Sequence, residues 1–197
     1  MGKSQEVKIT PVPFIFDPSF SIISGMCQDE NGFIWLAKTS DGLIRFDGTN
    51  KKYYRPNPND SSALHLDQLE CIAAGKGGEI WIGSIVDGLD RFDPKSESFT
   101  HYRKAPENPN SLRNDRIYSL LVDSSGTLWI GTDVGVDTLD RETGSFVQVK
   151  VDSPNGRMLQ KAFIRSIYED SSGVIWIGAG NAFDRTDSPS SGLYRVV

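Results

Sequence analysis

Few side chains in this 197-residue chain belong to the types that carry catalysis or metal binding. The two cysteines, Cys27 and Cys71, are widely separated, and so are the two histidines, His65 and His101. A zinc site needs several such ligands at short spacing, which this scatter does not offer. No nucleophile elbow, phosphate-binding loop or histidine-rich motif occurs either. We therefore expect no catalytic residue, no cofactor and no metal.

Binding is the chemistry that the remaining polar side chains favour. A sugar is held by planar side chains that form hydrogen bonds, together with an aromatic ring for stacking. Such side chains gather in segments rich in turn residues, between runs of apolar residues. The candidate ligand-binding residues are His65, Asp67, Gln68, Arg113, Asn114, Asp115, Arg116, Lys161, Asn181, Phe183 and Arg185. The alternative interpretation of each is a solvated loop residue that stabilises a turn.

A repeat identifies the elements that must position these residues. Trp35, Trp81, Trp129 and Trp176 follow one another at intervals of 46, 48 and 47 residues. A glycine stands three residues before each, at Gly32, Gly78, Gly126 and Gly173, and an aspartate six residues before three of them, at Asp29, Asp123 and Asp170, with Gly75 in the second copy. We expect the glycine to supply a positive φ and the aspartate to accept turn amides. The tryptophan should fill the space between units, and the glycine that follows two residues later in three copies should admit a neighbouring backbone.

Each copy consists of short apolar strands separated by turn residues. In the third copy the expected strands are 117–122, 127–131, 136–140 and 145–151. Four antiparallel strands per repeat of about 40 to 50 residues are typical of a β-propeller blade. The predicted fold class is therefore all-β, a β-propeller of about four blades that form part of a larger ring.

The expected organisation is an N-terminal segment, residues 1–21, followed by four propeller repeats over residues 22–197. The repeats cover 22–55, 69–103, 116–151 and 163–197, and the last lacks its outer strand. Residues 1–4 resemble a remnant of an expression vector, so we expect no signal peptide in this sequence. Residues 7–14 are interpreted as a strand that closes a blade. Unmatched blade faces at the two ends predict self-association, with a homodimer closing a ring of about eight blades.

Charge and hydropathy exclude further partners. The chain has 21 basic and 26 acidic residues, a net charge of -5, and such a chain is a poor phosphate binder. We therefore expect no contact with nucleic acid. No run approaches the roughly 20 apolar residues that span a bilayer, so membrane contact is expected only through a helix outside this sequence.

The candidate residues fall in loops that share one edge of a propeller, near its channel. Loops 56–68, 105–116 and 153–163 lead into innermost strands, and loops 38–41, 84–87, 132–134 and 179–191 join second and third strands. Residues 180–185 depart from the repeat and contain Phe183, the candidate stacking ring. Such departures are where repeat proteins gain binding loops.

The repeat resembles that of the two-component regulator propeller family over residues 20 to 197. The shared pattern is Asp-x-x-Gly-x-Ile/Leu-Trp-Ile-Gly-Thr, and Asn108-Pro109-Asn110-Ser111-Leu112 and Phe99-Thr100-His101-Tyr102 are close matches. The family is known from hybrid two-component histidine kinases of Bacteroides. The resemblance implies the non-catalytic, periplasmic sensor part of such a protein, which binds an oligosaccharide and, through the remainder of the sensor chain, regulates transcription of glycan-utilisation genes.

Two other functions stay open. One is a propeller that serves protein interaction or dimerisation without a small ligand. The other is a propeller lyase or glycan-active enzyme, such as the streptogramin lyases, whose repeats are similar. A lyase needs histidine and glutamate or a metal at the channel, and the sequence singles out no such set. Cys27 and Cys71 lie on expected innermost strands, where buried packing is favoured over a disulfide.

Overall fold

A computed structural model describes residues 10, 12, 22–149, 159, 162–180 and 191–196. The first sheet contains β1 (Ile23–Gln28), β2 (Ile34–Lys38), β3 (Gly42–Phe46) and β4 (Lys51–Tyr54). The second contains β5 (Leu69–Ala74), β6 (Ile80–Ser84), β7 (Leu89–Asp93) and β8 (Ser98–Tyr102). The third contains β9 (Ile117–Val122), β10 (Leu128–Thr132), β11 (Gly135–Asp140) and β12 (Ser145–Gln148). The fourth contains β13 (Ile164–Glu169), β14 (Ile175–Ala179) and β15 (Gly192–Arg195).

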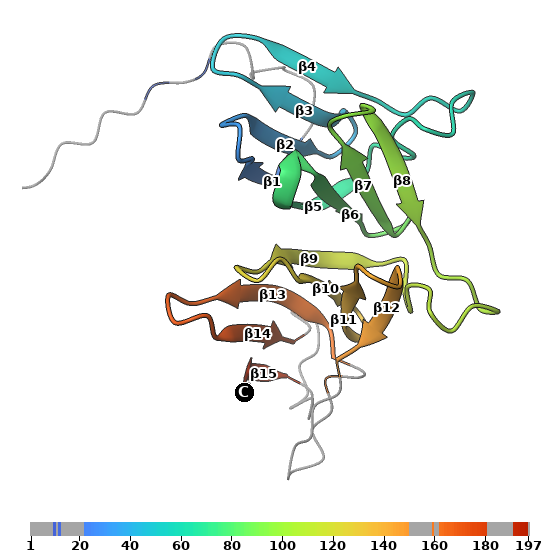
Figure 1. The fold of residues 1–197 in the computed structure, drawn as a ribbon, viewed down its shortest axis with the longest axis vertical. Coiled ribbons are helices and arrows are strands. Elements are labelled where there is room, and N and C mark those ends of the chain that lie inside the picture. Colours follow the sequence, from blue (N-terminus) through green and yellow to red (C-terminus); the bar gives the residue numbers. More distant parts are fainter. Residues whose placement is uncertain are drawn as a thin grey trace, which may run out of the picture.

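Each sheet is an antiparallel meander in which strands adjacent in sequence are hydrogen-bonded neighbours. The first strand of each sheet packs against the first strand of the next, so β1, β5, β9 and β13 follow one another along the inner side. Figure 1 shows the four sheets as successive layers. One short 3-10 turn, η1 (Lys76–Gly78), interrupts the strands in the described part of the chain. The predicted all-β propeller architecture of antiparallel blades is confirmed.

Three apolar clusters lie between neighbouring sheets and hold them together. Trp35, buried in the first, packs with residues of the second sheet such as Phe92, at a ring separation of 5.1 Å. Trp81 is buried among residues of the third sheet, including Leu128, and Trp129 packs against the cluster shared with the fourth. Aromatic side chains contribute large buried areas, so the predicted placement of tryptophan between blades is confirmed in these three interfaces.

The turn between the first two strands of a blade closes on its tryptophan. In the first blade Asp29 Oδ1 accepts the amides of Asn31 and Phe33, over 2.9 and 3.0 Å, and Oδ2 accepts the indole N–H of Trp35 over 2.7 Å. Asp123 with Trp129 and Asp170 with Trp176 repeat the indole bond at 2.8 Å. The aspartate therefore fixes both the turn and the tryptophan. The sequence predicted its bonds to the turn amides but not its bond to the indole.

In the second blade, a residue other than aspartate accepts the hydrogen bond from the indole of the tryptophan. Gly75 replaces the aspartate, and the indole N–H of Trp81 donates to Glu79 Oε1 over 3.1 Å instead. A Cβ at Gly75 would lie 2.5 Å from Glu79 Cγ, so the glutamate folds over the glycine. Arg141 of the third blade also donates to Glu79 Oε1, over 2.5 Å, which ties the two blades together.

The glycine two residues after the tryptophan accepts a side chain of the next blade. A Cβ at Gly83 would lie 2.6 Å from Ile117 Cγ2, and one at Gly131 would lie 2.7 Å from Ile164 Cγ2. Isoleucine from the innermost strand thus fits into a socket that only glycine leaves open. The expectation that a neighbouring backbone approaches this glycine was wrong, because the closest atoms are all side-chain atoms, from the isoleucine and from Cys71 or Ser119 of the same sheet.

The two ends of the array lack this contact. Gly178 occupies the socket position of the fourth blade, and its closest atoms all belong to Ser166 of the same sheet. Ile23 occupies the isoleucine position of the first blade and is 42% exposed. Tyr168 and Leu193 of the fourth blade are 63% and 70% exposed. The segment 7–14, predicted to close a blade, lies outside the described residues apart from Thr10 and Val12.

Both cysteines are free, and they lie on β1 and β5 as expected. Burial raises the pKa of the Cys27 thiol to about 12, and Cys71 is shifted upward for the same reason. Packing is therefore their role, in agreement with the interpretation favoured from sequence. Among the described residues there is no helix with the length and hydropathy required to cross a membrane.

Candidate functional site

The loops that lead into β5 and β9 meet the turns between second and third strands at one edge of the sheets, called the loop edge below. The amide of Ser40, in the β2–β3 turn, donates to the carbonyl of Asp67 over 2.9 Å. The amide of Gly88, after β6, donates to the carbonyl of Asp115 over 2.7 Å. The predicted meeting of the two loop sets is thus confirmed in the first three blades.

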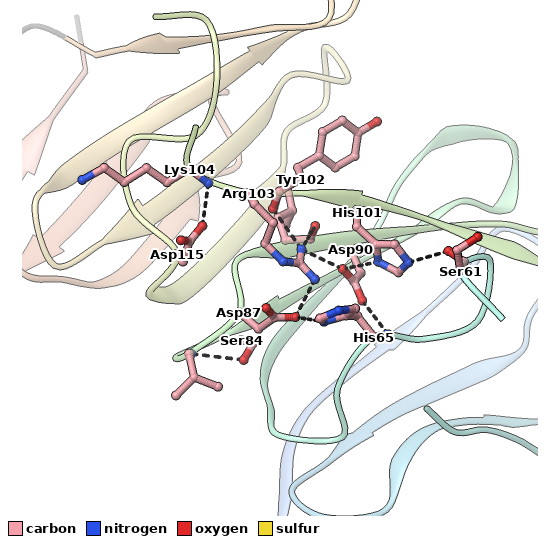
Figure 2. Close-up of polar contacts among 12 residues, drawn as sticks. Ser61, His65, Ser84, Asp87, Asp90, His101, Tyr102, Arg103, Lys104 and Asp115 are labelled. Atoms are coloured by element: carbon pink, nitrogen blue, oxygen red, sulfur yellow. Dashed lines mark hydrogen bonds and ion pairs between the residues drawn. The ribbon is translucent and has the colours of Figure 1, made fainter. Parts of the chain in front are cut away.

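A network of two histidines, two aspartates and one arginine occupies the loop edge of the second blade (Figure 2). His65 Nδ1 contacts Asp87, which also accepts Arg103 Nη2 over 2.5 Å. Arg103 Nη1 reaches Asp90 over 3.1 Å, and the same Asp90 oxygen contacts His101 Nδ1 over 2.9 Å. The arginine therefore joins two histidine–aspartate pairs, and the rings lie 5.4 Å apart between centroids.

His65 is the member of this network that solvent reaches, with its side chain 54% exposed. In the tautomer whose Nδ1–H donates to the Asp87 carboxylate, Nε2 is a hydrogen-bond acceptor. Asp87 is in turn held by Arg103, so the ring orientation is fixed before any ligand arrives. This arrangement suits a ligand group that donates a hydrogen bond to Nε2, such as a hydroxyl.

Arg113 has an anchoring role. Its Nε donates to Asp137 Oδ1 over 2.5 Å and its backbone amide reaches Oδ2 over 3.4 Å, while Nη2 donates to the carbonyl of Val136. Burial raises the pKa of the fully buried Asp137 carboxyl, opposed by the charge of Arg113. In the second blade the amide of His65 approaches Asp90 over 3.4 Å in the same way. In the second and third blades, an aspartate of the third strand therefore binds the loop that leads into the innermost strand.

The other predicted residues divide between turn contacts and exposed groups. Asp115 Oδ1 accepts the amide of Lys104 over 2.6 Å, and Asn114 Oδ1 accepts the amide of Arg116 over 2.8 Å. The Arg116 side chain is 62% exposed and lies 3.6 Å from Asp133. Gln68 forms a backbone bridge with Thr39, and Asp67 makes the carbonyl contact described above. Lys161, Asn181, Phe183 and Arg185 lie outside the described residues.

Every innermost strand carries a β-bulge close to the loop edge, which sequence interpretation missed. The pairing register skips one residue in each blade, at Ser24, Glu70, Tyr118 and Arg165. A bulge re-aims the side chain of its extra residue and is common beside binding sites. All four stand eleven residues before a tryptophan, and the residues differ from copy to copy, whereas the preceding position is always isoleucine or leucine. That contrast within the repeat could have identified them.

Two bulge residues meet on neighbouring innermost strands. The rings of Tyr118 and Phe163 lie 4.2 Å apart between centroids. The guanidinium of Arg165 lies 4.5 Å from the Phe163 centroid and 5.2 Å from that of Tyr118. These three residues are called the inner-strand cluster below. Within the described ranges no three histidine, cysteine or acidic residues gather as metal ligands.

Comparison with known proteins finds a family model that matches two segments of the chain. The two-component regulator propeller model matches residues 111–134 and 158–181. No curated protein matches the chain in sequence. The fold is similar to the extracellular domain of a hybrid two-component system from B. thetaiotaomicron, with a TM-score of 0.60 and 24% identity, over 82% of this chain and 29% of that domain.

Other solved propellers share the fold. A streptogramin B lyase superposes with a TM-score of 0.58 at 17% identity, covering 87% of this chain and 53% of the lyase. A protein of unknown function from Bacteroides caccae gives 0.58 at 13% identity, covering 87% and 61%. The chain thus spans less than a third of the Bacteroides sensor domain and somewhat more than half of the other two. The chain carries two-component regulator propeller repeats and has the propeller fold of the extracellular domains of Bacteroides hybrid two-component systems.

Proposed function

We propose that this chain is a ligand-sensing propeller segment of a periplasmic sensor in a hybrid two-component system, and that its ligand is an oligosaccharide. The observation that carries the proposal is the pair of two-component regulator propeller repeats at 111–134 and 158–181. Signal output to glycan-utilisation genes belongs to the remainder of the sensor chain, because the described blades hold no kinase or DNA-binding element.

The loop edge supports a role in binding. Exposed hydrogen-bonding groups there are held in fixed positions by partly buried partners, as His65 is by Asp87 and Arg103. A sugar needs several such groups whose orientation is set in advance, since ordering them on binding costs affinity. At the opposite edge of the second blade, ion pairs such as that of Glu97 with Lys52 join neighbouring blades, and Lys95 of the same turn is exposed.

A panel of plant and host oligosaccharides, titrated into the chain by calorimetry, tests this function. At least one glycan is expected to bind, and His65→Ala is expected to weaken it about tenfold, the loss of one hydrogen bond from a fixed group. Lys95→Ala is the matched control and should leave affinity unchanged. Failure of every glycan to bind would overturn the proposal.

A second candidate function rests on the open blade ends. Tyr168 and Leu193 expose apolar surface on one end and Ile23 on the other, and surfaces of this kind mark interaction sites. In this alternative the chain pairs with a second copy, head to tail, without a small ligand. The two candidates differ in measurable ways, because pairing changes the mass in solution and glycan binding does not require it.

A further inference from the structure

We infer that the inner-strand cluster binds an acidic sugar, with the guanidinium of Arg165 pairing with the carboxylate of a uronic acid residue. This inference rests on the proposed oligosaccharide-sensing function and adds the position of the site and the class of sugar. The cluster consists of Arg165 on β13, Phe163 directly before that strand, and Tyr118 on the neighbouring innermost strand β9.

Arg165 differs from the arginines of the loop edge in having no carboxylate partner. Arg55, Arg103, Arg113 and Arg116 each lie within 4 Å of an aspartate oxygen. Within the part of the chain that the structure describes, Arg165 makes neither a hydrogen bond nor an ion pair, and its side chain is exposed. Its positive charge and its N–H donors are therefore available to a ligand.

The two aromatic rings hold this guanidinium without consuming its donors. A guanidinium stacked on a ring uses its flat face, and its five N–H groups point outward in its own plane. With Phe163 at 4.5 Å and Tyr118 at 5.2 Å from the guanidinium carbon, the face is covered and the edge stays free. A carboxylate matches that edge with two parallel hydrogen bonds, which are stronger than bonds to a neutral hydroxyl.

The surroundings favour a sugar over a simple carboxylic acid. Glu70 takes the same bulge position on β5, and its carboxylate has no hydrogen-bond partner among the described residues. A carboxylate accepts hydrogen bonds from hydroxyl groups and repels a second carboxylate. It therefore fits the hydroxyl-bearing part of a ligand whose acid group lies at Arg165. His65 Nε2, at the neighbouring loop edge, offers a further acceptor for hydroxyl groups.

The test is calorimetric titration of oligomers of galacturonic, glucuronic and mannuronic acid, each beside its neutral counterpart. We expect a uronate oligomer to bind at least tenfold more tightly than the neutral sugar of the same linkage. Arg165→Met, which keeps the stem and removes the charge, should lower uronate affinity about ten- to hundredfold and remove the preference for acid. Arg165→Lys should keep only part of the uronate affinity, because an ammonium group cannot form the two parallel hydrogen bonds that a guanidinium forms with a carboxylate.

Arg195→Met is the matched control, since Arg195 is an exposed arginine on β15 of the same blade. It should leave uronate affinity unchanged, and unchanged thermal unfolding of all variants shows that they fold. Uronate binding that Arg165→Met does not alter, or binding confined to neutral sugars, would overturn this site and leave the sensing function standing. Absence of binding by every sugar in the panel would overturn both.

Discussion

At the scale of single residues, one aspartate in the first, third and fourth blades binds both the turn amides and the indole of the tryptophan. Asp29 accepts two turn amides with one oxygen and the indole of the buried Trp35 with the other. The Asp-x-x-Gly turn and the interblade tryptophan therefore depend on each other. In the second blade, where Gly75 stands in place of the aspartate, Glu79 supplies the acceptor for Trp81, which shows that the indole bond is what the position must satisfy.

Replacement of Asp29 by alanine is expected to destabilise the chain by about 2–3 kcal/mol. It leaves the indole N–H of Trp35, a residue 1% exposed, without a partner, and hydrogen bonds to charged groups contribute about 1.5–3 kcal/mol. Asp60→Ala, at an exposed turn where the carboxylate bonds only Ser62, is the control and should cost less than about 1 kcal/mol. Urea unfolding measures both, and equal losses would contradict the double role of Asp29.

Acid is expected to weaken the fold through the same carboxylates. The indole of Trp176 and the amide of Val174 lower the pKa of Asp170 below its ordinary value of 3.8. A carboxyl whose pKa is lower folded than unfolded stabilises the chain above the unfolded pKa, and this contribution is lost as the pH falls through the folded pKa. The urea midpoint should therefore drop below about pH 4, and less steeply in Asp170→Asn. An identical slope in that variant would show that the indole bond does not shift the pKa.

At the scale of strands and sheets, the interface between blades combines a glycine socket with an isoleucine from the next innermost strand. Gly131 and Ile164 form such a pair between the third and fourth blades. Gly178 is the same position in the fourth blade, with no neighbouring isoleucine beside it. The two glycines both follow Trp-Ile, but only Gly131 has an isoleucine of a following sheet packed against it among the described residues.

Gly131→Ala should destabilise the chain by about 1–3 kcal/mol, since its Cβ would lie 2.7 Å from Ile164 Cγ2 in a packed core. Gly178→Ala meets only the hydroxyl of Ser166, which can rotate away, so its cost should stay below about 1 kcal/mol. Thermal unfolding of the two variants checks this. A larger loss at Gly178 would refute the socket model of the interface.

The period of the tryptophans was sufficient to predict the blades, because each tryptophan marks the second strand of a blade, which carries buried core residues. The tryptophan spacing alone did not reveal the bulges, whose one trace in the sequence is a variable residue after an isoleucine or leucine in each copy. A bulge depends on how β9 and β10 pair, and Tyr118 looks like any alternating strand residue until its partner register is known. The anchoring of Arg113 was also hidden, because Asp137, its partner, lies 24 residues away in sequence on a different strand.

At the scale of the whole molecule, only Ser166 of the described residues lies close to Gly178 at one end of the array, and Ile23 is exposed at the other. Repetition of the internal interface would place Ile23 of one copy against Gly178 of another. Two such contacts, related by a two-fold axis, would join two arrays of four blades into a ring of eight. This pairing is the form of self-association that the repeat geometry favours.

Light scattering should then give a mass of twice 21.8 kDa at high concentration. Chains carrying Ile23→Cys mixed with chains carrying Gly178→Cys should form a mixed disulfide, because the equivalent internal Cβ positions at Gly131 and Ile164 lie 3.0 Å apart, close to disulfide reach. The buried native cysteines do not compete at neutral pH, with the pKa of Cys27 raised to about 12. A monomer at all concentrations with no mixed disulfide would rule out head-to-tail pairing.

The central claim, that an oligosaccharide binds where the loop edge meets the innermost strands, is tested most directly by mapping amide chemical shifts of the labelled chain during titration with a bound glycan. We predict that the shifts gather at His65, Tyr118 and Arg165, and that the turns around Asp47 and Lys95 stay unchanged. Shifts centred on those turns, or no shift with any glycan, would contradict the account.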